Sequence, residues 1–173
     1  MKKIILIILI FFLCHNIFCQ EQEYILKSAF IEKFCRFTEW PSESIDSSEY
    51  FHIALVGDNN FEKIFENIFN NITLKNKPVK IHRVKNIDRL KILPHLMFIS
   101  EDQKSDLDRI NQFASQNNIL TVGDSKDFGV KGIHINFYLT DQETLHFTIN
   151  LKSVEDAKLR INLMLIEIAK VIQ

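Results

Sequence analysis

The chain has 173 residues, a formal net charge of −1 and 46% hydrophobic residues. The near-neutral charge gives no support for a nucleic-acid-binding protein, and the length suits one domain with a substantial core. The order of the apolar segments therefore carries most of the information.

The first 20 residues have the layout of a secretory signal peptide. Lys2 and Lys3 precede an uninterrupted apolar segment at residues 4–13. This segment is about half as long as the ~20 apolar residues that a membrane-spanning helix needs. We therefore expect export, removal of residues 1–20, and a single domain over residues 21–173 with a net charge of −3.

Cysteine content limits the covalent chemistry of the mature chain. Cys14 and Cys19 lie in the leader, so Cys35 alone remains after cleavage and no internal disulfide can form. Lipidation of Cys19 is disfavoured because residues 16–18 lack the small residue expected before a lipid-modified cysteine. Cys35 is either buried or open to pairing with another chain, and burial is favoured because free cysteine is commonly buried.

Residues 24–38 have the apolar spacing of a helix. The stripe expected to face the core contains Leu26, Phe30, Phe34 and Phe37. A second apolar seam, about a quarter-turn away, contains Tyr24, Ile31 and Cys35. The polar side contains Ser28, Glu32, Arg36 and Glu39. Pro41 ends the helix, and residues 42–49 are expected to form a solvated loop.

The next part of the chain alternates strands with helices. Almost continuous apolar segments predict buried strands at residues 51–57, 95–100 and 119–123, and a more polar strand at residues 78–84. Helical patterns lie at residues 61–69, with Asn59 or Asn60 as cap, and at residues 105–116. This alternation predicts an α/β fold with a largely parallel open sheet flanked by helices.

A change of periodicity follows Gly132. Apolar and polar residues alternate over residues 133–139 and 145–151. Matching the apolar faces places Phe137 opposite Phe147 and Leu139 opposite Leu145, which predicts an antiparallel hairpin with a three-residue turn.

A long helix is predicted over residues 154–172, opened by Ser153 and Asp156 as a capping pair. Its core stripe contains Val154, Ala157, Ile161, Leu165, Ile168 and Ile172. Leu159, Leu163 and Ile166 lie on the opposite side, and an amphipathic surface helix needs a single stripe. These three residues either pack against the Tyr24, Ile31 and Cys35 seam or contact another chain.

Two acidic residues follow buried strands. Asp58 and Asp124 each end a Val-Gly-Asp sequence, and residues 100–102 follow a third strand. Ligands bind at the carboxyl ends of strands in an open parallel sheet, so these residues could form a rim that holds a ligand or a divalent cation. The alternative, that they turn the chain and cap the next helix, is favoured because Asp, Asn and Ser are common caps.

No pattern predicts a catalytic site, a metal site or a cofactor. The chain has no GxGxxG, GxxxxGK[ST] or GxSxG motif and no paired histidines at metal-binding spacing. His134 and His146 share a face of the hairpin but lie about 13 Å apart along the strand, too far for one zinc ion. We therefore expect a protein that is not an enzyme.

A basic segment spans residues 74–91, with seven Lys or Arg residues and one acidic residue, Asp88. It could contact anionic lipid headgroups or an acidic partner. The favoured alternative is that Lys80 and Lys85 protect an edge strand from pairing.

Several segments together resemble the YfiR family of exported bacterial proteins. They are residues 27–41, 54–61, 95–100, 119–128 and 149–162, and they occur in the order typical of the family. The Ala-Phe-Ile sequence at residues 29–31, followed by Phe-Thr-Glu-Trp-Pro at residues 37–41, is the most specific part. The resemblance implies a periplasmic, often dimeric, non-catalytic α/β domain that restrains a membrane-bound diguanylate cyclase and so affects cyclic-di-GMP signalling and biofilm formation.

This chain departs from the best-known members, which use redox-responsive disulfides, because Cys35 has no internal partner. Family relatives also occur beside sensor kinases and receptors. The leading hypothesis is a periplasmic protein that binds and represses an inner-membrane signalling protein through Leu159, Leu163, Ile166, Tyr24, Ile31 and Cys35. The alternative is a small-molecule or divalent-metal sensor that uses Asp58 and Asp124 and partners a sensor kinase or receptor.

Overall fold

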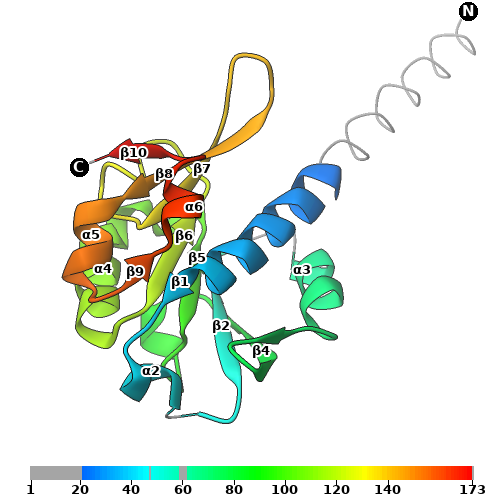
Figure 1. Cartoon of the computed structure of the whole chain (residues 1–173), viewed down its shortest axis with the longest axis vertical. Helices are drawn as coiled ribbons and strands as arrows, with labels where there is room; N and C mark the ends of the chain where they lie inside the picture. The colour runs from blue at the N-terminus through cyan, green and yellow to red at the C-terminus, as the bar shows by residue number, and fades with distance from the viewer. Residues whose placement is uncertain (1–20, 47, 59–61, 173) are drawn as a thin grey trace, which may run out of the picture.

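The computed structural model describes residues 21–46, 48–58 and 62–172 and shows a mixed α/β fold (Figure 1). The expected signal peptide and the expected helix cap at Asn59 or Asn60 fall outside these residues. In the described chain, a main sheet is covered by helices on both faces, which confirms the predicted fold class.

The main sheet has eight strands in the order β10-β8-β7-β6-β5-β2-β4-β3. Their bounds are β2 Phe51–Val56, β3 Thr73–Leu74, β4 Lys77–Val84, β5 Leu96–Ile99, β6 Leu120–Gly123, β7 Ile135–Leu139, β8 Leu145–Asn150 and β10 Lys170–Ile172. Neighbouring strands are parallel except for the β7–β8 and β4–β3 pairs. A separate two-stranded sheet joins β1 Thr38–Glu39 to β9 Arg160–Ile161.

Two apolar clusters lie on opposite faces of the main sheet. The N-terminal helix, residues 21–37, packs with α3 Glu62–Phe69, α5 Leu151–Asp156 and α6 Leu163–Ile166 against the face that includes Ile53 and Phe98. The other face includes Ala54 and Met97 and is covered by α4 Leu107–Asn117. Short 3-10 helices, η1 Ile87–Arg89 and η2 Glu101–Asp106, connect β4 to β5 and β5 to α4.

The N-terminal helix forms as predicted, but its inward face is shifted. Ile31, Phe34 and Cys35 are fully buried, whereas Leu26, expected in the core, is 46% exposed. Ser28, expected on the polar side, is buried, and its hydroxyl donates to Tyr24 O at 2.8 Å. The buried face therefore lies between the two predicted stripes, because side chains from both stripes reach the sheet.

The hairpin is confirmed with its predicted register. Phe137 pairs with Phe147 and Leu139 with Leu145. Residues 135, 137, 145, 147 and 149 face the core cluster, and polar residues alternate with them. Strict alternation fixes the register here because a shift by one residue would turn every apolar side chain to the opposite face.

The prediction of a long C-terminal helix is wrong. The chain instead forms α5, β9, α6 and β10 in succession. The cap of α5 is Asn150, whose side chain accepts from Ser153 N, so the predicted Ser153 and Asp156 pair does not open the helix. Lys158 then adopts a φ of 55°, and Asn162 N donates to Phe37 O at 2.8 Å. Pairing with β1 and β8 thus replaces the hydrogen bonds of a continuous helix.

The segment after Pro41 also differs from the prediction. Residues expected as a loop include a short helix, α2 Ser42–Asp46. Ser44 N donates to Pro41 O at 3.0 Å, and Ser44 Oγ contacts Asn118 Oδ1 at 2.9 Å at the end of α4. This long-range contact gives α2 a support that the local sequence does not indicate.

Candidate functional site

An apolar surface lies along the last part of the chain. Leu163 and Met164 of α6 are 72% and 64% exposed, and Ile168 is 62% exposed. Val171 of the edge strand β10 is also exposed. These four residues are named the C-terminal apolar surface. A group of exposed large apolar side chains on one short segment is typical of a protein contact site.

The fold separates the six side chains that the sequence placed at a partner interface. Ile31, Cys35 and Leu159 are buried in the core, so they cannot contact a partner on this surface. Burial also raises the pKa of the Cys35 thiol, which disfavours the reactive thiolate. Tyr24 and Ile166 are half-buried against the core cluster. Leu163 is exposed and belongs to the C-terminal apolar surface.

A continuous helix was predicted for this segment, so the exposure of Met164, Ile168 and Val171 was not expected. Helical spacing assigned Ile168 to the core stripe, but the chain leaves α6 before that residue. Asn162, which caps α6 by accepting from Met164 N at 2.9 Å, is a sequence signal for the new helix start. Reading it as a cap would have placed Leu163 and Met164 in an exposed first turn.

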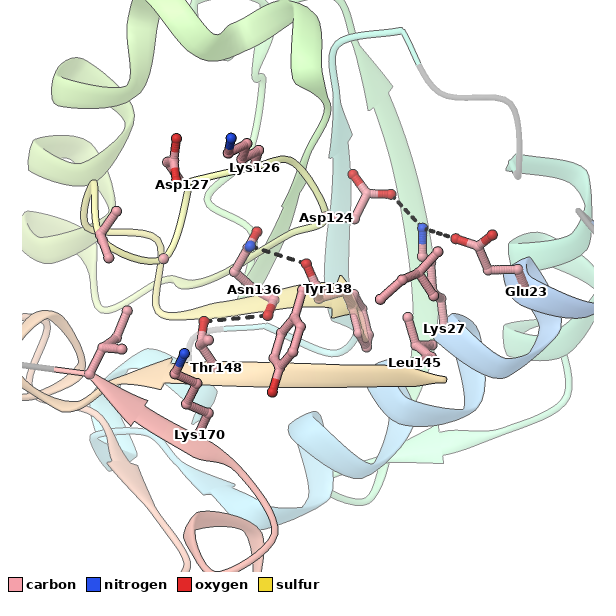
Figure 2. Close-up of a pocket in the computed structure, with 15 residues that line it drawn as sticks. Glu23, Lys27, Asp124, Lys126, Asp127, Asn136, Tyr138, Leu145, Thr148 and Lys170 are labelled. Atoms are coloured by element: carbon pink, nitrogen blue, oxygen red, sulfur yellow. Dashed lines mark hydrogen bonds and ion pairs between the residues drawn. The ribbon is translucent and has the colours of Figure 1, made fainter. Parts of the chain in front are cut away.

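A second feature is a pocket of about 470 Å³ at the edge where β6 and β7 end (Figure 2). The N-terminal helix contributes Glu23 and Lys27, and the loop after β6 contributes Asp124 and Lys126. The apolar walls are formed by Val130, Phe137, Tyr138, Leu139, Leu145 and Ile172. This volume is within the range of small-molecule sites, ~300–1,000 Å³.

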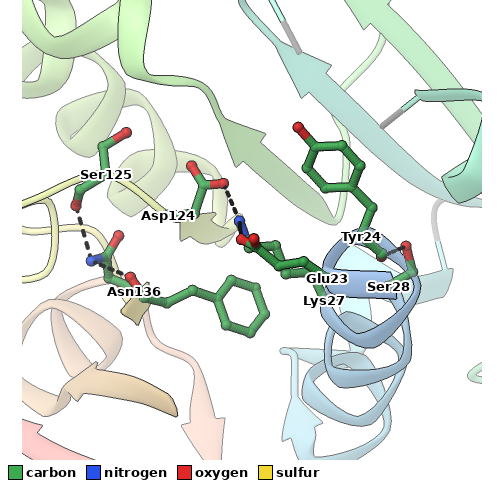
Figure 3. Close-up of polar contacts among 8 residues, drawn as sticks. Glu23, Tyr24, Lys27, Ser28, Asp124, Ser125 and Asn136 are labelled. Carbon is green, nitrogen blue, oxygen red and sulfur yellow. Dashed lines mark hydrogen bonds and ion pairs between the residues drawn. The ribbon is translucent and has the colours of Figure 1, made fainter. Parts of the chain in front are cut away.

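Lys27 is the central charge of this pocket. Its Nζ lies 2.7 Å from Asp124 Oδ2 and 2.7 Å from Glu23 Oε1 (Figure 3). Burial lowers the pKa of Lys27, but the charges and hydrogen bonds of Asp124 and Glu23 outweigh burial, so the pKa is raised. Lys27 was missed by the sequence reasoning, although it lies one turn before the buried Ile31.

The structure holds the loop after β6 in place through Asn136 of β7. Asn136 Nδ2 donates to Ser125 O at 3.1 Å (Figure 3). Ser125 directly follows Asp124, so this hydrogen bond orients the loop toward Lys27. The pocket therefore combines fixed polar groups with apolar walls.

Asp58 and Asp124 lie in different surroundings. Asp58 N donates to Asp102 Oδ1 at 3.1 Å, and Asp58 is not among the residues that line the Asp124 pocket. Gly57 has a φ of 93°, and a Cβ there would lie 2.3 Å from Asp102 Oδ1. Asp58 thus belongs to a tight turn against Asp102. In the described residues, no group of three or more His, Cys, Asp or Glu is arranged to hold a metal ion.

A model of the YfiR/HmsC-like family matches residues 24–170. The chain belongs to the YfiR/HmsC-like family. The match spans most of the N-terminal helix, the main sheet except for the end of β10, and three residues of the C-terminal apolar surface, and it confirms the resemblance seen in the sequence. Comparison with curated proteins gives no match. Membership of the YfiR/HmsC-like family suggests a regulatory protein of the periplasm rather than an enzyme.

Among the helices of the described residues, none has the length and apolar character needed to cross a bilayer.

This YfiR/HmsC-like fold also gathers three histidines that sequence spacing did not connect. His52 Nδ1 lies 2.9 Å from His82 Nε2, and His95 Nδ1 accepts from His52 N at 2.9 Å. Burial, then the charges of His82, His95 and Lys80, lower the pKa of His52 to about 4. The strand order β4-β2-β5 creates this cluster, and that order could not be read from residue spacing.

Proposed function

We propose that this protein is a periplasmic regulator that binds the extracytoplasmic part of an inner-membrane signalling protein and represses it, with a diguanylate cyclase as the leading partner. Membership of the YfiR/HmsC-like family is the observation that carries this proposal. The C-terminal apolar surface supports it, because large apolar side chains exposed together favour contact with another protein.

The C-terminal apolar surface is suited to binding because core packing and a backbone hydrogen bond hold it in place. Leu165, between Met164 and Ile166, is 3% exposed and belongs to the core cluster. Asn162 N donates to Phe37 O, which attaches α6 to the end of the N-terminal helix. A preformed surface loses little conformational entropy when a partner binds.

Repression follows from differential affinity. Binding moves the partner toward its inactive state only if this protein binds that state more tightly than the active one. No catalytic step by the regulator is needed, so its concentration in the envelope and its affinity set the degree of repression.

Cross-linking the protein in its native envelope and identifying the captured membrane protein tests the proposal. We expect capture of one inner-membrane signalling protein, and loss of capture for the double variant Leu163→Glu, Ile168→Glu. A matched control is Leu93→Glu, which places a charge on another exposed apolar residue. Capture of no membrane signalling protein would overturn the proposed function.

A second candidate function is a sensor of small molecules or divalent metal ions that acts with a sensor kinase or receptor. The pocket beside Lys27 and Asp124 favours it, because fixed charges and apolar walls meet there. Calorimetric titration with calcium and magnesium chloride, for the wild type and Asp124→Ala, tests the metal form of this idea. Heat of binding that disappears in Asp124→Ala would support it, and absence of heat with the wild type would remove it.

A further inference from the structure

The strand β4 forms most of one end of the main sheet, far from β10 (Figure 1). Its outer neighbour, β3, pairs with it at two positions, Thr73 with Pro78 and Leu74 with Lys77. The remaining six residues, 79–84, pair with β2 on the inner side. Within the described residues, no strand pairs with the outer edge of β4 beyond Pro78, and such an edge presents backbone groups that can accept another strand.

The direction of these backbone groups follows from one hydrogen bond. Val84 O accepts from Gly57 N, which continues β2, so the backbone groups of Val84 point inward. Backbone groups of alternate residues point to opposite edges of a strand, so those of Val79 and Ile81 point outward. Outer pairing is described for Lys77 and Pro78 but for neither of these two residues.

A groove lies directly beside this edge. It has a volume of about 370 Å³ and is lined by residues 81–84 of β4 and residues 89–92 of the crossover to β5. Val84, Leu90 and Ile92 provide its apolar part, and all three are half-buried. The groove gives alternate side chains of an added strand a place to pack.

The exposed charges of residues 79–92 that form no ion pair are all cationic. Lys80, Lys85, Arg89 and Lys91 are exposed, and none forms an ion pair with another described residue. The acidic residue of this segment, Asp88, is already paired with Arg109 at 2.6 Å. Four cations without local counter-charges oppose pairing with a second copy of the same edge and attract a negatively charged chain.

We propose that the open edge of β4 is a docking site for an acidic, extended segment of the partner protein, which adds to the sheet as a further strand. This inference rests on the proposed function, since it concerns the chemistry of the same partner. Backbone hydrogen bonds to Val79 and Ile81 supply affinity, and carboxylates opposite Lys80, Lys85 and Lys91 supply selectivity. The C-terminal apolar surface would then be a separate contact at the other end of the sheet.

The first test uses an eight-residue fluorescent peptide of alternating valine and glutamate. Wild-type protein is expected to bind it with an affinity that falls as salt increases, and a valine–lysine peptide is expected not to bind. The variant Lys85→Glu, Lys91→Glu is expected to lose affinity by about ten-fold or more. The matched control, Lys131→Glu, Lys158→Glu, changes two exposed lysines outside this segment and is expected to bind as the wild type does.

Hydrogen exchange identifies the binding mode without any substitution. Bound valine–glutamate peptide should slow exchange of the Val79 and Ile81 amides. Binding without that protection, equal losses in both double variants, or no binding of the peptide would each overturn the proposal. Adsorption to phosphatidylglycerol vesicles together with no peptide binding would assign the cations to a lipid surface instead.

Capture in the native envelope separates this inference from the proposed function. If the wild type captures a membrane signalling protein and Lys85→Glu, Lys91→Glu captures it equally well, the docking strand is wrong while the regulatory function stands. If the wild type captures none, the regulatory function itself fails.

Discussion

At the β10 end of the sheet large apolar side chains are exposed beside Lys170, whereas at the β4 end Lys80, Lys85 and Lys91 are exposed. β10 has three residues and presents little backbone at its outer edge. β4 has eight residues, and β3 covers two of its positions. A long open edge needs charge to prevent self-association, while a short one tolerates apolar residues. The two ends are therefore suited to different contacts, one made by side chains and the other by backbone.

The largest expected effect on stability comes from a substitution in the core that supports the apolar end. Phe34 is fully buried, and its ring centroid lies 5.4 Å from Phe137 and 4.9 Å from Phe147 of the hairpin. Phe34→Ala should lower the free energy of unfolding by about 3–5 kcal/mol because it leaves a cavity. Chemical denaturation measures this loss. The neighbouring exposed Lys33→Ala should change it by less than about 0.5 kcal/mol, and similar values for the two variants would contradict the packing described.

Lowering the pH should destabilise the fold at both ends of the sheet, because each end contains a histidine that is neutral in the folded state. His134, near the apolar end, is buried, its Nδ1 accepts from Thr121 N at 3.0 Å, and burial lowers its pKa to about 4. His52, at the cationic end, also has its pKa lowered to about 4. The unfolded chain binds these protons first, so stability is full above about pH 7, falls as the pH decreases through 6.5, and levels off near pH 4.

For His134 the expected loss in the free energy of unfolding across this pH window is about 3 kcal/mol, since one pKa unit corresponds to ~1.4 kcal/mol. Denaturation at pH 7.5, 6, 5 and 4 measures it. His134→Asn keeps an acceptor for Thr121 N, cannot be protonated, and should flatten the profile. His82→Asn at the other end should have a smaller effect, because His82 is half-exposed. A wild-type profile that is flat from pH 7.5 to 5 would contradict this explanation.

A smaller effect is expected at the pocket that contains Lys27. Asp124→Ala removes one of the two carboxylates that hold Lys27 and should destabilise the fold by about 1–2 kcal/mol, because Glu23 still pairs with the buried ammonium. The double variant Lys27→Met, Asp124→Ala should lose less than the sum of the single variants. Thermal denaturation of all three variants measures the coupling, and strict additivity would show that the ion pair contributes nothing.

The smallest effect on stability is expected at the surfaces themselves. Leu163→Glu, Ile168→Glu and Lys85→Glu, Lys91→Glu alter exposed side chains, so each double variant should unfold within about 0.5 kcal/mol of the wild type. Circular dichroism during denaturation checks this. A large loss of stability in either variant would mean that its side chains support the fold rather than a contact.

The sheet and the hairpin could be predicted because their signals are local. Phe137 and Leu139 alternate with polar residues, and matching the apolar faces places them opposite Phe147 and Leu145, the register that forms. The C-terminal segment could not be predicted in the same way. Leu163 and Ile166 fit a helical spacing, but pairing of Ile161 with Thr38 and of Val171 with Ile149 depends on segments far away in the sequence.

The candidate sites show the same division. Asp124 was found because it follows a buried strand, while its partner Lys27 comes from a helix 97 residues earlier. The histidine cluster required the order of β4, β2 and β5, which residue spacing does not contain. The family resemblance came from short sequences, and the family match confirms it without identifying which surface meets a partner.

The most direct test of the central claim measures cyclic-di-GMP formation by membranes that contain the captured signalling protein. Added wild-type protein should reduce the rate in a concentration-dependent manner, and Leu163→Glu, Ile168→Glu should leave it unchanged. An unchanged rate with the wild type, or equal inhibition by the variant, would contradict repression through the C-terminal apolar surface.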